Sequence, residues 1–252
     1  MRPPTALTAM EFDDQAFILS ARPYGETGAI VEALTASHGK YAAYVAGGAS
    51  RRMKAALQTG SLAIVRYRAR VSDQLGSATV EAVGEGASTL FDDPLALAAL
   101  AAAAAVTGGA LPEREPHPGT FLAFEALTRS LADPDIWPPI FVRFEAGLLR
   151  ELGFGLDLTR CAVTGSADEL IYVSPRTGRA VSARAGDPYK DRLLRLPAFL
   201  LSAQGRLAPG DIAAGLALTG HFLESCVFAA LNRPLPPARL WLMDRLRDAK
   251  QL

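Results

Sequence analysis

The chain has 252 residues, half of them hydrophobic and 21% charged, which is typical of a globular protein with one large domain or two ordinary ones. Its 26 Lys and Arg residues balance 26 Asp and Glu residues. This neutrality excludes a protein that attracts polyanions through a global field, so an electrostatic partner must be held by a local patch.

The N-terminus, the cysteines and one uncharged run indicate in which cellular compartment the protein is expected. Residues 1–9 contain a single Arg and no apolar core of a signal peptide, so we expect a disordered extension or a start assigned too early. Cys161 and Cys226 form at most one disulfide, and reduced thiols are the better interpretation. The uncharged run Pro94–Pro112 is mostly alanine and predicts a buried helix, not a membrane span. We therefore expect a cytoplasmic protein without a membrane segment.

The first third of the chain predicts strands separated by turns rich in glycine and polar residues. The expected strands are Gln15–Ala21, Ala29–Thr35, Lys40–Ala46, Leu62–Val71 and Leu75–Val83. Five strands at this spacing favour a small closed Greek-key barrel of the OB type.

The pattern changes to helical periodicity after Glu85. Asp93 is a typical N-cap and Pro94 a typical first helical residue. Further helices are expected in residues 119–133, 139–153, 211–231 and 237–249, with a hairpin insert near 168–186. The sequence thus predicts an α+β protein with an extension (1–9), an OB barrel (10–85) and a helical domain (86–252).

One stretch of the predicted barrel carries basic residues without acidic ones. Between Ala33 and Ser72 there is no Asp or Glu. The cations in this stretch are Lys40, Arg51, Arg52, Lys54, Arg66, Arg68 and Arg70. Because most solvated surfaces mix both signs, this composition indicates a surface that binds an anionic partner.

The alternation of side chains along a strand predicts on which face these cations lie. Arg66, Arg68 and Arg70 have the same parity and share one face of a strand, and Lys40 shares a face with Tyr44. Cations beside an outward aromatic ring are the elements of single-stranded nucleic-acid sites. The alternative is that the arginines are only solvated or paired with distant acids, and that Tyr44 is a packing residue.

The order of motifs resembles that of the RecO family of bacterial recombination mediators and DNA-repair proteins. The second half is similar as well, over "RFEAGLLRELGFGLDLTRCAVTG" and "YVSPRTGRAV". The matching residues of the first half are Tyr24-Gly25-Glu26, Gly28, Ala29–Leu34, Thr35, His38-Gly39-Lys40, Gly47-Gly48, Arg51-Arg52, Arg70, Leu75, Gly76 and Glu81.

The resemblance implies an OB-fold followed by a helical domain, with no catalysis. It implies binding of single- and double-stranded DNA, association with the nucleoid and strand annealing. It also implies work with RecR and the C-terminal tail of the single-stranded-DNA-binding protein to help load RecA. Among the barrel cations, it extends to Lys40, Arg51, Arg52 and Lys54, and less securely to Arg70. The terminal helix at 237–249 either packs on the helical domain or docks such an acidic, apolar tail.

The chain departs from this family in one respect, because many relatives carry a zinc knuckle of two C-x-x-C pairs. The corresponding positions here are Cys161, Thr164, Ser182 and Ala185. One thiolate cannot hold a tetrahedral zinc, so we expect no metal and no other cofactor.

No motif in the sequence indicates an enzyme. The phosphate-binding loop with Lys-Ser/Thr, the G-x-S-x-G elbow and the H-E-x-x-H pair are all missing. His38, His117 and His221 have no sequence neighbour that suggests a nucleophile or a metal. The sequence predicts a DNA-binding and annealing accessory protein, and the alternative is a protein-interaction scaffold whose DNA binding is incidental.

Overall fold

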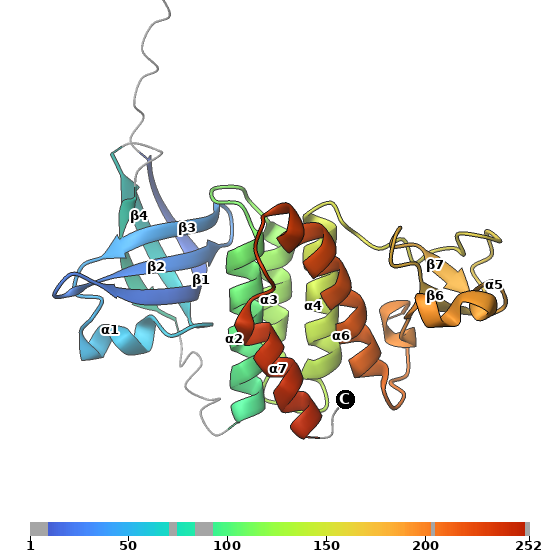
Figure 1. Cartoon of the computed structure of the whole chain (residues 1–252). Helices are drawn as coiled ribbons and strands as arrows, with labels where there is room; N and C mark the ends of the chain where they lie inside the picture. The colour runs from blue at the N-terminus through green and yellow to red at the C-terminus, as the bar shows by residue number, and fades with distance from the viewer. Residues whose placement is uncertain (1–9, 71–74, 84–92, 203–204, 250–252) are drawn as a thin grey trace, which may run out of the picture. The chain divides into compact units, whose positions relative to one another are not determined.

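The computed structural model describes residues 10–70, 75–83, 93–202 and 205–249 (Figure 1). The chain divides into two compact units, Met1–Leu122 and Ala123–Leu252, with the division inside helix α3 (Pro118–Ser130). The predicted extension 1–9 and the predicted domain boundary near residue 86 lie outside the described residues.

The first unit contains a closed barrel with the strand order β1-β2-β3-β5-β4. A short helix, α1 (Arg51–Ala56), connects the third strand to the fourth. The strands are β1 (Met10–Tyr24), β2 (Gly28–Thr35), β3 (Gly39–Val45), β4 (Leu62–Ala69) and β5 (Gly76–Ala82). The predicted five-stranded barrel of the OB type followed by a helical region is therefore confirmed.

Strand β1 closes the barrel because it pairs with two partners in succession. Residues 10–17 pair with β4 and residues 16–24 pair with β2, with a bulge between Ile18 and Ser20. A bulge increases local bend and twist, and this allows one long strand to curve around a small barrel. The strand begins five residues earlier than the predicted Gln15.

Alternating apolar side chains fill the barrel. Phe12, Tyr41 and Tyr67 meet in the interior with ring centroids 4.9–5.1 Å apart. Val65 and Ala69 are also buried, whereas the intervening Arg66, Arg68 and Arg70 are exposed. The predicted alternation of buried and exposed residues in β4 is confirmed. On β3, the burial of Tyr41 raises the pKa of its phenol above 10.0.

Helix α2 (Pro94–Ala110) packs against β1 in the same unit. The Asp93 carboxylate accepts hydrogen bonds from the backbone N–H groups of Leu95 and Ala96 at 2.9 and 3.0 Å, so the predicted N-cap is confirmed. Its buried face is mostly alanine, which lets the helix approach the strand closely. In the described part of the chain, no helix is long and apolar enough to span a membrane.

The second unit is built from helices and a small three-stranded sheet of order β7-β6-β8. Helices α4 and α6 pack together, and β8 extends the predicted hairpin by a third strand. The elements are α4 (Trp137–Glu151), β6 (Leu170–Val173), β7 (Ala180–Ser182), α5 (Ala183–Gly186), β8 (Leu194–Arg195), α6 (Asp211–Phe222) and α7 (Pro237–Asp248).

The helix predicted for residues 211–231 is interrupted. It is α-helical to Phe222 and then continues as a π-helix over Leu223–Phe228. Apolar spacing does not distinguish these two windings, because both bury residues at intervals of three to five.

A buried ion pair connects three helices of the second unit. The Arg239 guanidinium of α7 donates to both carboxylate oxygens of Glu145 on α4, at 2.6 and 3.0 Å. Thr219 on α6 donates to the same carboxylate, and Arg239 donates to the Leu216 carbonyl at 2.8 Å. Burial acts to lower the pKa of Arg239, but the Glu145 carboxylate outweighs this and raises it overall, so the guanidinium stays charged.

Candidate nucleic-acid interface

The turn from β3 into α1 depends on two glycines. Gly47 has a φ of +68°, a conformation that favours glycine. A Cβ atom at Gly48 would collide with Ala29 and with the Val45 carbonyl oxygen. Ala49 then donates to the Thr27 carbonyl at 3.0 Å, which fixes this turn beside the β1–β2 turn.

Helix α1 presents basic side chains at its N-terminal end. Ser50 caps it, since its hydroxyl accepts from the Met53 N–H at 3.4 Å. Arg51, Arg52 and Lys54 are all exposed, and the first turn contains no acidic residue. Arg51 and Arg52 lie at the N-terminus, where cations act against the helix dipole, whereas Lys54 lies in the last turn, where a cation is favourable. Within the described ranges, none of the three forms an ion pair.

The arginines of β4 lie opposite acidic residues of β1. Arg66 meets Asp13 at 3.2 Å and Arg68 meets Glu11 at 2.7 Å. The side chains are 61–73% exposed, so each pair contributes only about 0.2–1 kcal/mol and leaves its arginine able to change partners. Arg70 is exposed and has no ion pair among the residues that the structure describes.

Lys40 and Tyr44 lie at different ends of β3. The Lys40 ammonium donates to the Gly108 carbonyl of α2 at 2.6 Å and is partly buried. Tyr44 is half-buried and contacts Tyr24 edge to face, with ring centroids 6.2 Å apart. Tyr24 is itself 55% exposed.

The structure therefore brings some predicted residues together and separates others. Tyr44 lies near the α1 cations, because Tyr24 and Gly28 flank the β1–β2 turn that Ala49 contacts. Lys40 is held at α2, and the β4 arginines form a second group. Sequence reasoning missed Tyr24 as an exposed ring and missed the acids of β1. Glu11 and Asp13 have the same strand parity, and an earlier start of that strand would have placed both on the outer face.

Two positions of the degenerate zinc knuckle, Thr164 and Ser182, contact the thiol of a third, Cys161. Cys161 is buried, and its Sγ accepts from the Ser182 N–H at 3.3 Å. Burial acts to raise the pKa of this thiol, but hydrogen bonds from Ser182 and Thr164 outweigh it and lower the pKa to about 6. One sulfur ligand does not fit tetrahedral zinc, and no group of three His, Cys, Asp or Glu side chains in the described segments could hold a metal.

The second unit contains a groove of about 470 Å³ with two arginines and an apolar lining. Arg143 donates to the carbonyls of Phe199 and Ser202, at 2.7 and 3.0 Å, whereas Arg150 is exposed. Leu156, Leu158, Phe199, Leu200 and Leu201 supply the apolar lining.

The terminal helix α7 has a buried and an exposed face. Arg239, Leu242 and Leu246 are buried, so this face packs on the helices of the second unit. Leu240 and Trp241 are 50% and 68% exposed, and Arg245 lies 5.7 Å from the Trp241 ring.

A closed barrel of five strands in this order, with a helix between the third and fourth strands, defines an OB-type protein. The family described as Recombination protein O N terminal matches residues 10–84, and Recombination protein O C terminal matches residues 92–234. The chain belongs to the RecO family of DNA repair proteins.

Several relatives resemble the chain over nearly its whole length. The DNA repair protein RecO of Phenylobacterium zucineum (strain HLK1) is 72% identical over 96% of this chain and 100% of its own. RecO of Caulobacter vibrioides (strain NA1000 / CB15N) is 68% identical over the same shares. RecO of Rhodospirillum centenum (strain ATCC 51521 / SW) is 50% identical over 95% of this chain and 96% of its own.

Proposed function

We propose that the protein binds single- and double-stranded DNA through its barrel and promotes annealing of complementary strands. In this role it is a non-enzymatic accessory factor of recombinational DNA repair. The observation that supports this most is the group Arg51, Arg52 and Lys54, which is exposed and, among the described residues, has no ion pair. Neutralising the phosphates of two strands removes the repulsion that slows their pairing.

Aromatic rings near these cations support single-strand binding. Tyr24 and Tyr44 lie on the same side of the barrel as the turn that leads into α1. Exposed rings accept unpaired bases by stacking, while cations follow the phosphates. Arg66, Arg68 and Arg70 extend the proposed surface along β4, and Lys40 stays a predicted contributor.

The test is the triple variant Arg51→Ala, Arg52→Ala and Lys54→Ala, studied by fluorescence anisotropy of labelled single-stranded DNA over a series of salt concentrations. Loss of three phosphate contacts should flatten the log–log salt dependence by about two units. A triple variant Arg184→Ala, Lys190→Ala and Arg192→Ala removes the same charge from exposed sites of the second unit and serves as the control. A wild-type protein that ignores oligonucleotides at low salt would support the scaffold alternative instead.

We further propose RecR and the acidic tail of the single-stranded-DNA-binding protein as partners, and RecA as an indirect one. The groove with Arg143 and Arg150 suits a tail that is acidic and ends in apolar residues, because its lining offers both chemistries. Substituting Arg150→Glu should abolish binding of that peptide, while Arg233→Glu, an exposed control, should not. Equal loss in both variants would point to a nonspecific charge effect. We propose that the region around Cys161 works without a metal.

A further inference from the structure

Strand β5 has one edge that is only partly covered. Along its length it pairs with β4, from Ser77 to Ala82. On its other side it pairs with β3 at two positions only, where Gly76 and Ser77 meet Ala43 and Tyr44. Strand β3 ends at Val45 and the chain continues into α1, so among the described residues the edge of β5 beyond Ala78 has no neighbouring strand.

The alternation of the antiparallel ladder shows which backbone groups face this open edge. Val83 donates to the Leu62 carbonyl at 2.8 Å, so the odd-numbered residues of β5 direct their N–H and C=O groups to β4. Val80 and Ala82 therefore direct theirs to the opposite side. In the described part of the chain these groups have no backbone partner on that side. Unpaired strand edges are sites where another strand can add.

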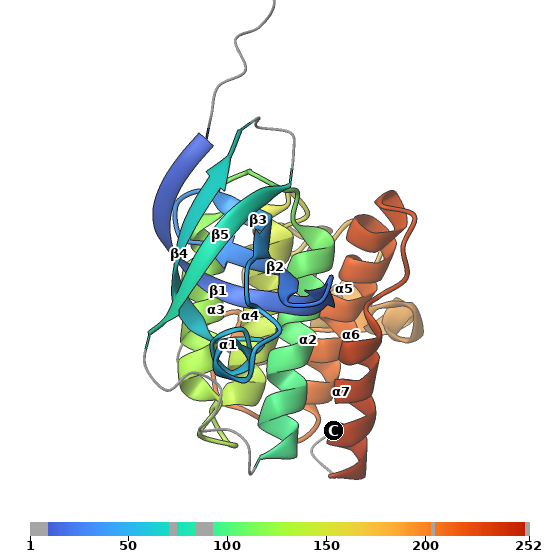
Figure 2. The same cartoon turned by 90° about the vertical axis from the view of Figure 1, so that its left-hand side faces the viewer.

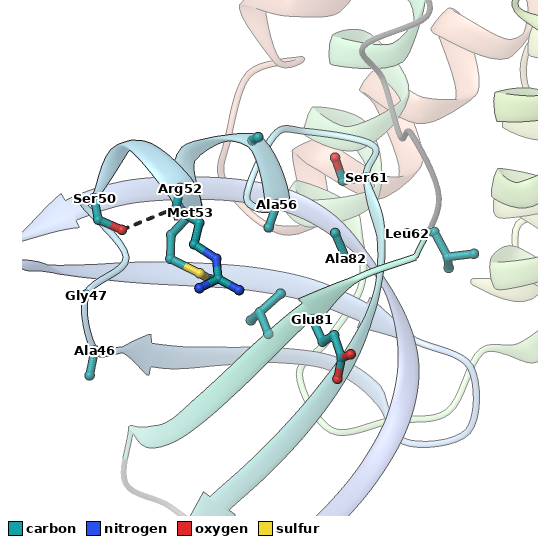
Figure 3. A pocket seen from close by; sticks show the side chains of 12 residues that line it. Ala46, Gly47, Ser50, Arg52, Met53, Ala56, Ser61, Leu62, Glu81 and Ala82 are labelled. Atoms are coloured by element: carbon teal, nitrogen blue, oxygen red, sulfur yellow. Dashed lines mark hydrogen bonds between the residues drawn. The ribbon is translucent and has the colours of Figure 1, made fainter.

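A groove of about 580 Å³ runs between this edge and α1. Its walls are mostly small, with Ala46, Gly47, Ala55, Ala56 and Ala82 among the lining residues. Figure 3 shows the side chains of Arg52 and Met53 extending from α1 towards the strand that carries Glu81. Figure 2 shows α1 at one end of the barrel, near the ends of β4 and β5.

We propose that this groove binds an extended, acidic peptide segment of a partner protein, which adds as a strand to the free edge of β5. A peptide backbone offers both donors and acceptors at the spacing that Val80 and Ala82 require. The small side chains leave room for its backbone. The lining contains two charged residues, Arg52 on α1 and Glu81 on β5, so the carboxylates of the peptide would face α1 and Arg52. This inference does not depend on DNA binding, although both use Arg52.

A nucleic-acid strand suits the groove less well. Its phosphodiester backbone accepts hydrogen bonds but does not donate them, so it would not pair with the carbonyls of Val80 and Ala82. The lining also contains no aromatic ring on which a base could stack. In this proposal the exposed cations of α1 bind phosphates, whereas the groove between α1 and β5 binds a peptide.

The test uses a capped peptide of alternating glutamate and valine, titrated to millimolar concentration into the full-length protein. Amide hydrogen exchange followed by NMR should show the N–H groups of Val80 and Ala82 slowed by about tenfold. A peptide with N-methyl groups on alternate residues cannot form the strand pairing and should give no protection. Absence of protection with the unmethylated peptide, or the same protection by a single-stranded oligonucleotide, would overturn the proposal.

Two pairs of variants test separately the charge of Arg52 and the backbone pairing at the edge of β5. Arg52→Glu should weaken peptide binding about tenfold, whereas Arg51→Glu on the same helix, outside the groove lining, should change it less than twofold. Ala82→Pro removes an open-edge N–H and should abolish protection of Val80, while Ala82→Val retains that N–H and should preserve it. Thermal unfolding verifies that each variant is folded. Equal effects of the two arginine variants would contradict a site in the groove.

Discussion

Arg239 in the helical unit and Arg52 in the barrel unit are the same side chain in opposite settings. Arg239 is 3% exposed and donates to the Glu145 carboxylate and to a backbone carbonyl. Arg52 is exposed, stands at a helix N-terminus and, within the described residues, has no acidic partner. A charge that is buried against a carboxylate and a backbone carbonyl positions helices, whereas a charge left in water at an unfavourable helix end is available to a ligand.

The arginines of β4 lie between these extremes. Arg66 and Arg68 have partners, but the pairs are exposed and weak. Burial of the pair, and not the mere presence of a partner, therefore distinguishes a structural arginine from one that is accessible to a ligand.

The largest expected effect is on the buried pair. Arg239→Leu should cost about 3–5 kcal/mol of unfolding free energy, because it leaves the Glu145 carboxylate buried without its counter-ion. Urea unfolding, followed by the fluorescence of the buried Trp137 in a Trp241→Phe background, measures this change. Arg233→Leu, on the surface, is the control and should change stability by less than about 0.5 kcal/mol.

The double variant Glu145→Leu with Arg239→Leu sharpens the same point. Replacing both charges removes the orphaned carboxylate, so it should recover part of the loss caused by Arg239→Leu alone. If the double variant loses more stability than Arg239→Leu and Glu145→Leu lose together, this account of the ion pair is contradicted.

The next effect concerns the thiol of Cys161 and depends on pH. Its pKa in the folded protein is lowered to about 6 from a usual 9.0, so the thiolate contributes stability that is fully present above the unfolded pKa and is lost as pH falls through about 6. The wild type should melt at a higher temperature than Cys161→Ala, and this difference should increase by several degrees from pH 6 to pH 9. Cys226→Ala is the control, and a gap that narrows with rising pH would refute the stabilised thiolate.

Local features of the sequence predicted much of the fold. Asp93 and Pro94 define the start of α2 through their own backbone chemistry. Alternation over residues 62–69 predicted which side chains fill the barrel, because neighbouring residues of a strand face opposite sides. These predictions succeeded since each depends on contacts within a few residues.

The partners of the charged residues could not be predicted in this way. Arg68 meets Glu11 across 57 residues, Lys40 meets Gly108 across 68, and Arg239 meets Glu145 across 94. Each contact depends on strand register or helix packing, which a single sequence does not determine. The basic stretch from Ala33 to Ser72 is free of acids along the chain, but β1 places two acids beside it in space.

Two lysines of the barrel unit, one partly buried and one exposed, test whether burial also distinguishes residues that stabilise the fold from residues that bind DNA. Lys40→Met removes a charged hydrogen bond to Gly108 and should cost about 1.5–3 kcal/mol of stability, and it should lower DNA affinity less than Lys54→Met does, because Gly108 holds the Lys40 ammonium. Lys54→Met should leave stability unchanged and weaken single-stranded DNA binding about twofold to threefold at low salt. Thermal unfolding and fluorescence anisotropy of the same two samples measure both quantities. The reverse assignment of effects would show that Lys40 is the DNA ligand of the pair.

The smallest effect tests whether the acids of β1 weaken the charge of the β4 arginines. The double variant Glu11→Gln and Asp13→Asn should lower stability by less than about 1 kcal/mol, since exposed pairs contribute little. It should raise the affinity for single-stranded DNA about threefold at low salt, because two carboxylates no longer repel the phosphates that approach Arg66 and Arg68. Glu125→Gln with Asp244→Asn breaks two ion pairs outside the barrel, the first with a half-buried carboxylate, and makes the same change in net charge. An equal rise in both double variants would mean that net charge, and not the face formed by β1 and β4, governs binding.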